Sequence, residues 1–146
     1  MEERSKARFR ATRERVGLSQ KALADTLGNC VDMVKRWENP RYAPPPADAW
    51  ALLDDMLERH IEAVETAVGV VRRQMRERGG KPGEVRLLYY RSQAQYDAYG
   101  RDPGDYAVVD ARVRETAAVL GHMGIDVTFA YPEDDELMFQ ALANTR

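Results

Sequence analysis

The stretch LSQKALADTLGNCVDMVKRWENP, residues 18–40, decides the fold of the first half of the chain. Ser19 is a good helix N-cap, because its hydroxyl can accept a hydrogen bond from a backbone amide one turn further on. Ala22, Leu23 and Leu27 then recur at helical spacing, which places them on one face. The stretch is therefore predicted to begin with a short helix that buries an apolar side.

A tight turn and a second short helix are predicted next. Gly28 should end the first helix, since glycine adopts the positive φ of a helix C-terminus without steric cost. The second helix is expected from about Val31 to Glu38, with Val34 and Trp37 on its buried side. Two such helices form a helix-turn-helix, whose second helix lies in the major groove of DNA. The alternative is a helical hairpin whose apolar residues only fill a core.

Five features of the stretch agree in spacing with a known motif. Gln20 follows the cap of the first helix, Gly28 lies in the turn, Val34 is in the core of the second helix, and Trp37 precedes Glu38-Asn39. In these features the stretch resembles the Cro/repressor, or XRE, family of helix-turn-helix regulators. The resemblance implies a regulator that binds double-stranded DNA in a sequence-specific manner.

Charge is distributed unevenly along the chain. The net charge is −2, but residues 1–42 carry ten Lys/Arg against six Asp/Glu, whereas residues 43–146 carry twelve against eighteen. A basic N-terminal region beside the motif and an acidic remainder favour a single DNA-facing end.

Three residues of the second helix are predicted to contact bases. Arg36 is the first choice, because a guanidinium can bind guanine O6 and N7 in bidentate fashion. Asp32 would either accept from a cytosine amino group or orient a neighbouring arginine, and both roles remain open. Val31 could contact a thymine methyl group.

Other polar residues are predicted to contact the DNA backbone. Gln20 could reach a phosphate from the start of its helix, and Lys35, Asn39 and Arg41 lie on or after the second helix. The segment from Glu2 to Val16 is rich in arginine and is expected to form a helix that ends near Gly17 and packs behind the motif. Within it, Arg13 matches a position that commonly contacts phosphate in the XRE family.

A long helical tract follows Ala43-Pro44-Pro45-Pro46. Apolar residues recur at steps of three or four from Trp50 to Met75, and Gly79-Gly80 ends the tract. One helix or two fit this pattern. A single rod would be about 45 Å long at 1.5 Å per residue, so a break between Asp54 and His60 is expected.

The pattern changes beyond residue 83. β-Branched and aromatic residues predict strands over Glu84–Tyr90 and Asp126–Tyr131, while helices are expected over Ser92–Tyr99 and Ala111–Met123. The last segment, Pro132–Arg146, begins with an acidic run suited to a helix N-terminus and continues with Leu137, Phe139 and Leu142. The predicted fold class is mostly α: a helix-turn-helix domain over residues 1–58, followed by a small α+β dimerisation domain over residues 59–146.

The second half carries a resemblance of its own. Its order is a long helix, a Gly-Lys-Pro turn, a strand with LLYY, a short helix with tyrosines, an amphipathic helix and a terminal strand. This plan looks like that of the YdiL-like regulators and of the related anti-CRISPR-associated (Aca) autorepressors. The resemblance implies a homodimer bound to an inverted-repeat operator. Tyr89, Tyr90, Phe129 and Tyr131 are candidates for the dimer interface, with a role in the monomer core as the alternative.

No catalytic, cofactor or metal site is predicted. His60 and His122 are isolated, and no Cys, His and carboxylate spacing resembles a zinc site. Cys30 is the single cysteine of the chain. The sequence shows no signal-peptide pattern and no apolar run long enough to span a membrane, so the expected compartment is the cytoplasm. An antitoxin that caps a toxin through its acidic second half is the main alternative. RNA binding is less favoured, because no aromatic strand platform is visible in the N-terminal half.

Overall fold

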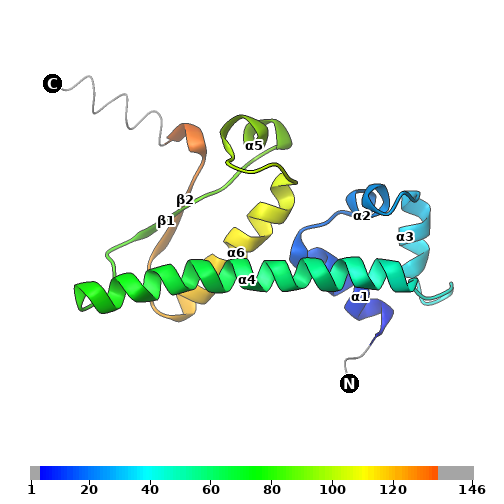
Figure 1. Ribbon diagram of the computed structural model, residues 1–146, viewed down its shortest axis with the longest axis horizontal. Coiled ribbons are helices and arrows are strands. Elements are labelled where there is room, and N and C mark those ends of the chain that lie inside the picture. Colours follow the sequence, from blue (N-terminus) through cyan, green and yellow to red (C-terminus); the bar gives the residue numbers. More distant parts are fainter. Residues whose placement is uncertain (1–3, 135–146) are drawn as a thin grey trace. The chain divides into compact units, whose positions relative to one another are not determined.

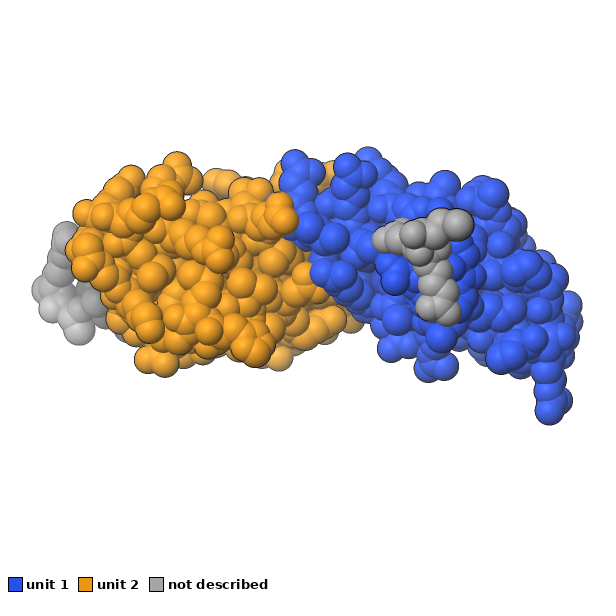
Figure 2. Space-filling model, turned by 90° about the horizontal axis from the view of Figure 1, so that it is seen from below, with its two compact units in different colours: residues 1–62 blue, residues 63–146 orange. Residues whose placement is uncertain are grey.

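The computed structural model describes residues 4–134. The chain divides into two compact units, residues 1–62 and 63–146, which Figure 2 colours separately. The predicted class is confirmed: the chain is mostly helical, with a small sheet in the second unit. The expected domain boundary was 58/59, and the units divide between Glu62 and Ala63, inside a continuous helix.

The described part of unit 1 consists of three short helices and the first part of a long one (Figure 1). They are α1 (Lys6–Val16), α2 (Gln20–Thr26), α3 (Val31–Trp37) and the start of α4 (Ala47–Arg78). Gly17 ends α1 with φ of 88°, which only glycine adopts without strain. The sequence-based ends of the first three helices are therefore confirmed to within about a residue.

Aromatic contacts form the centre of the unit 1 core. Phe9 of α1 is fully buried and meets two rings edge-on: Trp37 of α3 at 6.3 Å and Trp50 of α4 at 5.1 Å between centroids. Each such pair contributes about 0.5–1.5 kcal/mol beyond its buried area. Val34 and Leu53 are also fully buried. Phe9 thereby ties α1, α3 and α4 together.

Helix α4 runs without interruption from Ala47 to Arg78, so the expected break between Asp54 and His60 is wrong. That interval contains neither glycine nor proline, and its Asp55 and Arg59 form an ion pair at 3.1 Å across one turn. His60, at the end of the interval, is fully buried. The helix therefore continues through this interval because its apolar face stays buried, despite the length that led us to expect a break.

In the described part of unit 2, the second part of α4 is followed in the sequence by a strand, two helices and another strand. These are β1 (Val85–Leu88), α5 (Gln93–Tyr99), α6 (Tyr106–His122) and β2 (Val127–Ala130). The strands pair in parallel, with Val85 opposite Val127 and Leu88 opposite Ala130. Both strands lie where the sequence predicts them, and α6 begins five residues earlier because Asp105 caps it, accepting from the Ala107 amide at 2.8 Å. The predicted segment from residue 135 onward lies outside the described residues.

The core of unit 2 gathers the second part of α4, the end of α6 and the starts of both strands. Val64, Val68, Val71, Leu120 and Ile125 are buried together. A two-stranded sheet is only marginally stable by itself, so its packing on α4 and α6 is what holds β1 and β2 in place.

Asp110 of α6 is a buried carboxyl group in this unit. Its Oδ1 accepts a hydrogen bond from the Tyr90 amide at 2.9 Å, just after β1. Burial raises the pKa of Asp110, and the Tyr90 amide and the nearby Arg114 charge offset only part of that rise. The contact anchors α6 to the end of β1 at an electrostatic cost.

The pKa shift of Asp110 predicts a pH-dependent stability. Since the folded state binds this proton more tightly than the unfolded chain does, stability falls as the pH rises through the raised pKa. Asp110→Asn keeps an oxygen for the Tyr90 amide and removes the charge. Its free energy of unfolding should therefore exceed that of the wild type by a margin that grows as the pH rises from about 4, the ordinary pKa of an aspartate, through the raised pKa of Asp110. Urea unfolding followed by circular dichroism measures this margin.

The control for that experiment is Asp102→Asn, at an exposed loop position. Because this side chain is exposed, its replacement should change the free energy of unfolding by about 0.5 kcal/mol or less. A pH-independent difference for Asp110→Asn would contradict the assignment.

Candidate nucleic-acid interface

The turn between α2 and α3 has the geometry that the sequence predicts. The Ser19 hydroxyl accepts from the Ala22 amide at 3.0 Å and caps α2. Gly28 has φ of 66°, and the Asn29 amide donates to the Ala24 carbonyl at 2.8 Å, which closes the turn. Cys30 precedes α3 without a side-chain capping bond and is exposed. The two short helices are therefore joined by a defined turn.

Helix α3 has one buried and one exposed face. Val34 is fully buried and Trp37 is 4% exposed. Asp32, Lys35 and Arg36 are exposed, and Val31 is half-buried at the edge of that face. The structure therefore brings together all three predicted base contacts and the predicted phosphate contact Lys35.

Lys6 fixes the C-terminal end of α3. Its ammonium group donates to the carbonyls of Arg36 at 3.1 Å, Trp37 at 2.9 Å and Ala43 at 2.7 Å. The last carbonyls of a helix have no hydrogen-bond partner within it, and the positive charge of a lysine there is attracted to the negative end of the helix dipole. One side chain from α1 thus holds both the end of α3 and the loop that follows.

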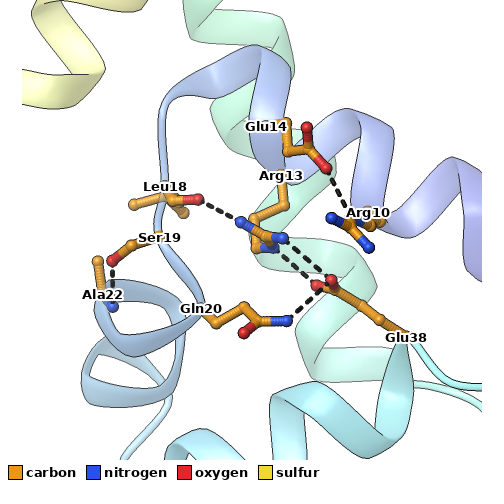
Figure 3. A network of polar contacts seen from close by, with 8 residues as sticks. All are labelled: Arg10, Arg13, Glu14, Leu18, Ser19, Gln20, Ala22 and Glu38. Carbon is orange, nitrogen blue, oxygen red and sulfur yellow. Dashed lines mark hydrogen bonds and ion pairs between the residues drawn. The ribbon is translucent and has the colours of Figure 1, made fainter.

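A buried ion pair joins α1 to the residue that ends α3 (Figure 3). The Arg13 guanidinium donates to both carboxylate oxygens of Glu38, from Nε at 2.7 Å and from Nη2 at 3.0 Å, and its Nη1 donates to the Leu18 carbonyl at 2.8 Å. The two side chains are only 8% and 4% exposed. A buried charge is stable only when it is paired and its hydrogen bonds are satisfied, and the bidentate contact meets both conditions.

Gln20 belongs to the same network. Its side-chain amide donates to Glu38 Oε1 at 3.2 Å (Figure 3). The sequence assigned Arg13 and Gln20 to the DNA backbone, and the structure gives both a different partner. Because the donors of Arg13 are engaged in a buried network, this side chain orients α3 instead of lying on the surface.

Arg36 is exposed but already partly ordered. Its guanidinium lies over the ring of Tyr42, 5.5 Å from the centroid, and Tyr42 is 51% exposed. A cation–π contact of this kind contributes about 0.5–1 kcal/mol at an exposed site. The predicted base contact therefore has a neighbour that restricts its conformations.

The loop after α3 holds the remaining predicted contacts. The Asn39 side chain accepts from the Arg41 amide at 3.0 Å, so its oxygen shapes the turn. Arg41 is exposed. Within residues 4–134, Lys35 and Asp32 form no ion pair or side-chain hydrogen bond, so both are available to an external partner.

Other basic residues of unit 1 are paired on its surface. Arg10 bonds to Glu14 at 2.7 Å, and this hydrogen bond raises the pKa of Arg10. Arg4 lies over Trp50 at 4.8 Å and bridges to Asp54 at 3.1 Å. The arginine-rich α1 is thus largely committed to contacts within the unit.

The sequence did not predict three residues that contribute to this site: Lys6, Tyr42, and Glu38 as the partner of Arg13. Lys6 contacts residues thirty or more positions away, and no local spacing indicates such a contact. Glu38 was marked only by its place in the Trp-Glu-Asn pattern.

Unit 2 has an exposed aromatic surface beside the ends of the strands. Phe129 and Tyr131 are 52% and 42% exposed, and with Tyr89, Ala130 and Asp134 they line a pocket of about 250 Å³. Tyr90, by contrast, is buried against Tyr96 at 4.9 Å. The four aromatic candidates therefore divide: Tyr90 belongs to the core, Phe129 and Tyr131 face outward, and Tyr89 is half-buried beside the pocket.

Among residues 4–134, no group of three or more His, Cys, Asp or Glu side chains is placed to hold a metal ion. No helix in this part of the chain combines the length and apolar character needed to cross a membrane.

The Arg13–Glu38 pair predicts a large and asymmetric mutational effect. Glu38→Ala leaves Arg13 buried without its carboxylate, so the free energy of unfolding should fall by about 3–5 kcal/mol. The double replacement Arg13→Met with Glu38→Leu removes both charges and should lie closer to the wild type. Urea unfolding followed by circular dichroism tests both variants.

Lys21→Ala, in the exposed Lys21–Asp25 pair, is the control and should change the free energy of unfolding by about 0.5 kcal/mol or less. A Glu38→Ala loss as small as that of the control would contradict the role of the pair.

Comparison with known proteins gives no match: no protein-family model, no protein of established function and no solved structure is significantly similar to this chain.

Proposed function

We propose that the chain is a sequence-specific, double-stranded DNA-binding transcriptional regulator that acts as a homodimeric repressor on an inverted-repeat operator. The observation that carries this proposal is the exposed face of α3. Val31, Asp32, Lys35 and Arg36 lie together there, on a helix whose other face is anchored in the core. The second helix of a helix-turn-helix lies in the major groove with such a face toward the bases.

Rigid anchoring of α3 supports this proposal. Lys6 holds the end of the helix, Glu38 is clamped by Arg13, and Trp37 packs edge-on against Phe9. A helix of seven residues is too short to be stable by itself, so these contacts fix its orientation. Preorganised side chains lose less conformational entropy when they bind.

Within this face we assign Arg36 to base recognition. It carries a guanidinium that matches the two acceptors of guanine, and Tyr42 holds it on one side. Val31 could contact a thymine methyl group, and Asp32 could accept from cytosine or orient Arg36. Lys35 and Arg41 are exposed cations suited to phosphate.

A homodimer follows from the limited reach of one α3 helix. A single recognition helix contacts only a few base pairs, whereas a two-fold dimer matches two half-sites about one turn of DNA apart. Occupying such an operator would block access by polymerase. Unit 2 is proposed as the dimerisation unit.

A protein partner other than a second copy is the second candidate. The exposed Phe129 and Tyr131 beside the 250 Å³ pocket favour it, because exposed aromatic residues are enriched in protein interfaces. An antitoxin would use such a surface to bind its toxin. Co-purification of the chain with the product of an adjacent gene, lost in Phe129→Ser, would support this alternative.

Arg36→Ala tests the proposed base contact. Once in vitro selection from random duplexes has defined the operator, the variant should bind it about 10- to 100-fold more weakly and bind random DNA almost as well as the wild type. Lys35→Ala should weaken both equally and lower the salt slope by about one. Fluorescence anisotropy at several salt concentrations measures both effects.

Arg101→Ala, on an exposed loop of unit 2, is the control. An equal loss on operator and random DNA would make Arg36 a phosphate contact, and no loss would remove α3 from the interface.

Tyr42 offers a separate test of preorganisation. Tyr42→Ala should weaken operator binding less than Arg36→Ala does, because it removes only the contact that orders the guanidinium. In the Arg36→Ala background the same change should have little further effect. Additive losses in the double variant would show that Tyr42 contacts DNA independently.

A further inference from the structure

We propose that a second copy of this chain docks on the groove between α4 and α6 of unit 2, with the two α4 helices antiparallel and crossing at Gly69. The inference rests on the homodimer proposed above and identifies the surface that forms it. Three features of the unit support it: an apolar groove, a reciprocal pair of charges and an otherwise unexplained glycine.

The groove has an apolar floor and charged walls. It measures about 390 Å³ and is lined by Val64, Val68 and Val119, with the exposed Glu65 and Arg72 beside them. Val64 and Val68 belong to the core of unit 2, so this core reaches the surface here. An apolar centre with a polar rim is the usual pattern of a protein interface.

The two charges are suited to a two-fold partner. Glu65 and Arg72 lie seven residues apart on one flank of α4, about 10 Å along its axis, which is too far for a direct bond. Within residues 4–134 neither forms an ion pair. An antiparallel α4 centred between Val68 and Gly69 would place Glu65 of each copy opposite Arg72 of the other.

That reciprocity is what a two-fold interface requires: residue i contacts residue j, and j contacts i. A parallel arrangement would instead oppose glutamate to glutamate and arginine to arginine, which is repulsive. The charge pattern therefore selects the antiparallel arrangement.

Gly69 directly follows Val68 and lies near the midpoint between Glu65 and Arg72 along the axis of α4, next to the residues that line the groove. A Cβ atom added there would meet no atom within 4 Å, so packing inside unit 2 does not require a glycine. Glycine in a helix interior lowers helix stability relative to alanine. Its small size does allow a second helix to approach closely, since the distance between packed helices depends on the side chains at the contact.

The aromatic pocket beside Phe129 lacks such a pattern. Asp134, which lines it, accepts a hydrogen bond from the Tyr131 amide at 3.0 Å, and the neighbouring Arg91 and Glu133 pair with each other at 3.3 Å. It therefore offers no reciprocal charges to a second copy.

Charge reversal in the full-length chain tests the proposal by sedimentation over a concentration series without DNA. Glu65→Lys and Arg72→Glu should each weaken dimerisation by at least about tenfold, because like charges then face each other twice. An equimolar mixture of the two variants should form a heterodimer, since both contacts become complementary. The double variant Glu65→Lys with Arg72→Glu should dimerise again. Glu77→Lys, on another flank of α4, is the control.

Gly69→Leu gives a second measurement that is independent of charge. It should keep the helical circular dichroism of the wild type and lose the dimer. A wild-type dimer unaffected by either single charge reversal, or one dissociated by Phe129→Ser alone, overturns the proposed surface while leaving the homodimer intact. A wild-type monomer that still binds a selected operator overturns the dimer itself, and DNA recognition by α3 then stands without it.

Discussion

The buried ion pair between Arg13 and Glu38 is the interaction on which the candidate interface depends. It joins α1 to the end of α3, with both side chains almost fully buried. A buried charge without a partner is strongly destabilising, so the pair admits few alternative arrangements of these helices. Lys6 and Phe9 add two further contacts from α1 to the same end of α3. The direction of α3 is thus determined largely by side chains outside the two helices of the motif.

This arrangement divides five basic residues in and around the motif into two groups. Lys6 and Arg13 are used inside the unit, whereas Lys35, Arg36 and Arg41 are exposed on α3 or directly after it. Net charge alone does not distinguish the groups. Of these five residues, only Lys35, Arg36 and Arg41 are exposed and can contribute directly to an external contact.

Unit 2 combines structural contacts with surface features that the fold does not explain. Asp110 is buried at an electrostatic cost and holds α6 to the end of β1. Among the described residues, Glu65 and Arg72 form no ion pair, and a side chain at Gly69 would meet open space, so neither feature has a comparable role in that part of the unit. Such features are the ones that an assembly would account for.

Local sequence patterns determined most of the secondary structure. Ser19, Gly17 and Gly28 act within a turn of their own positions, so capping and positive φ predicted the ends of α1 and α2, and apolar spacing predicted the buried Val34 and Trp37. The positions of both strands followed from their β-branched and aromatic residues in the same way. Tertiary structure decided what depends on distant partners. Arg13 and Gln20 meet Glu38 across 25 and 18 positions, and Lys6 meets the end of α3 across 30 or more. No local period encodes such pairings, because they arise only when the helices pack.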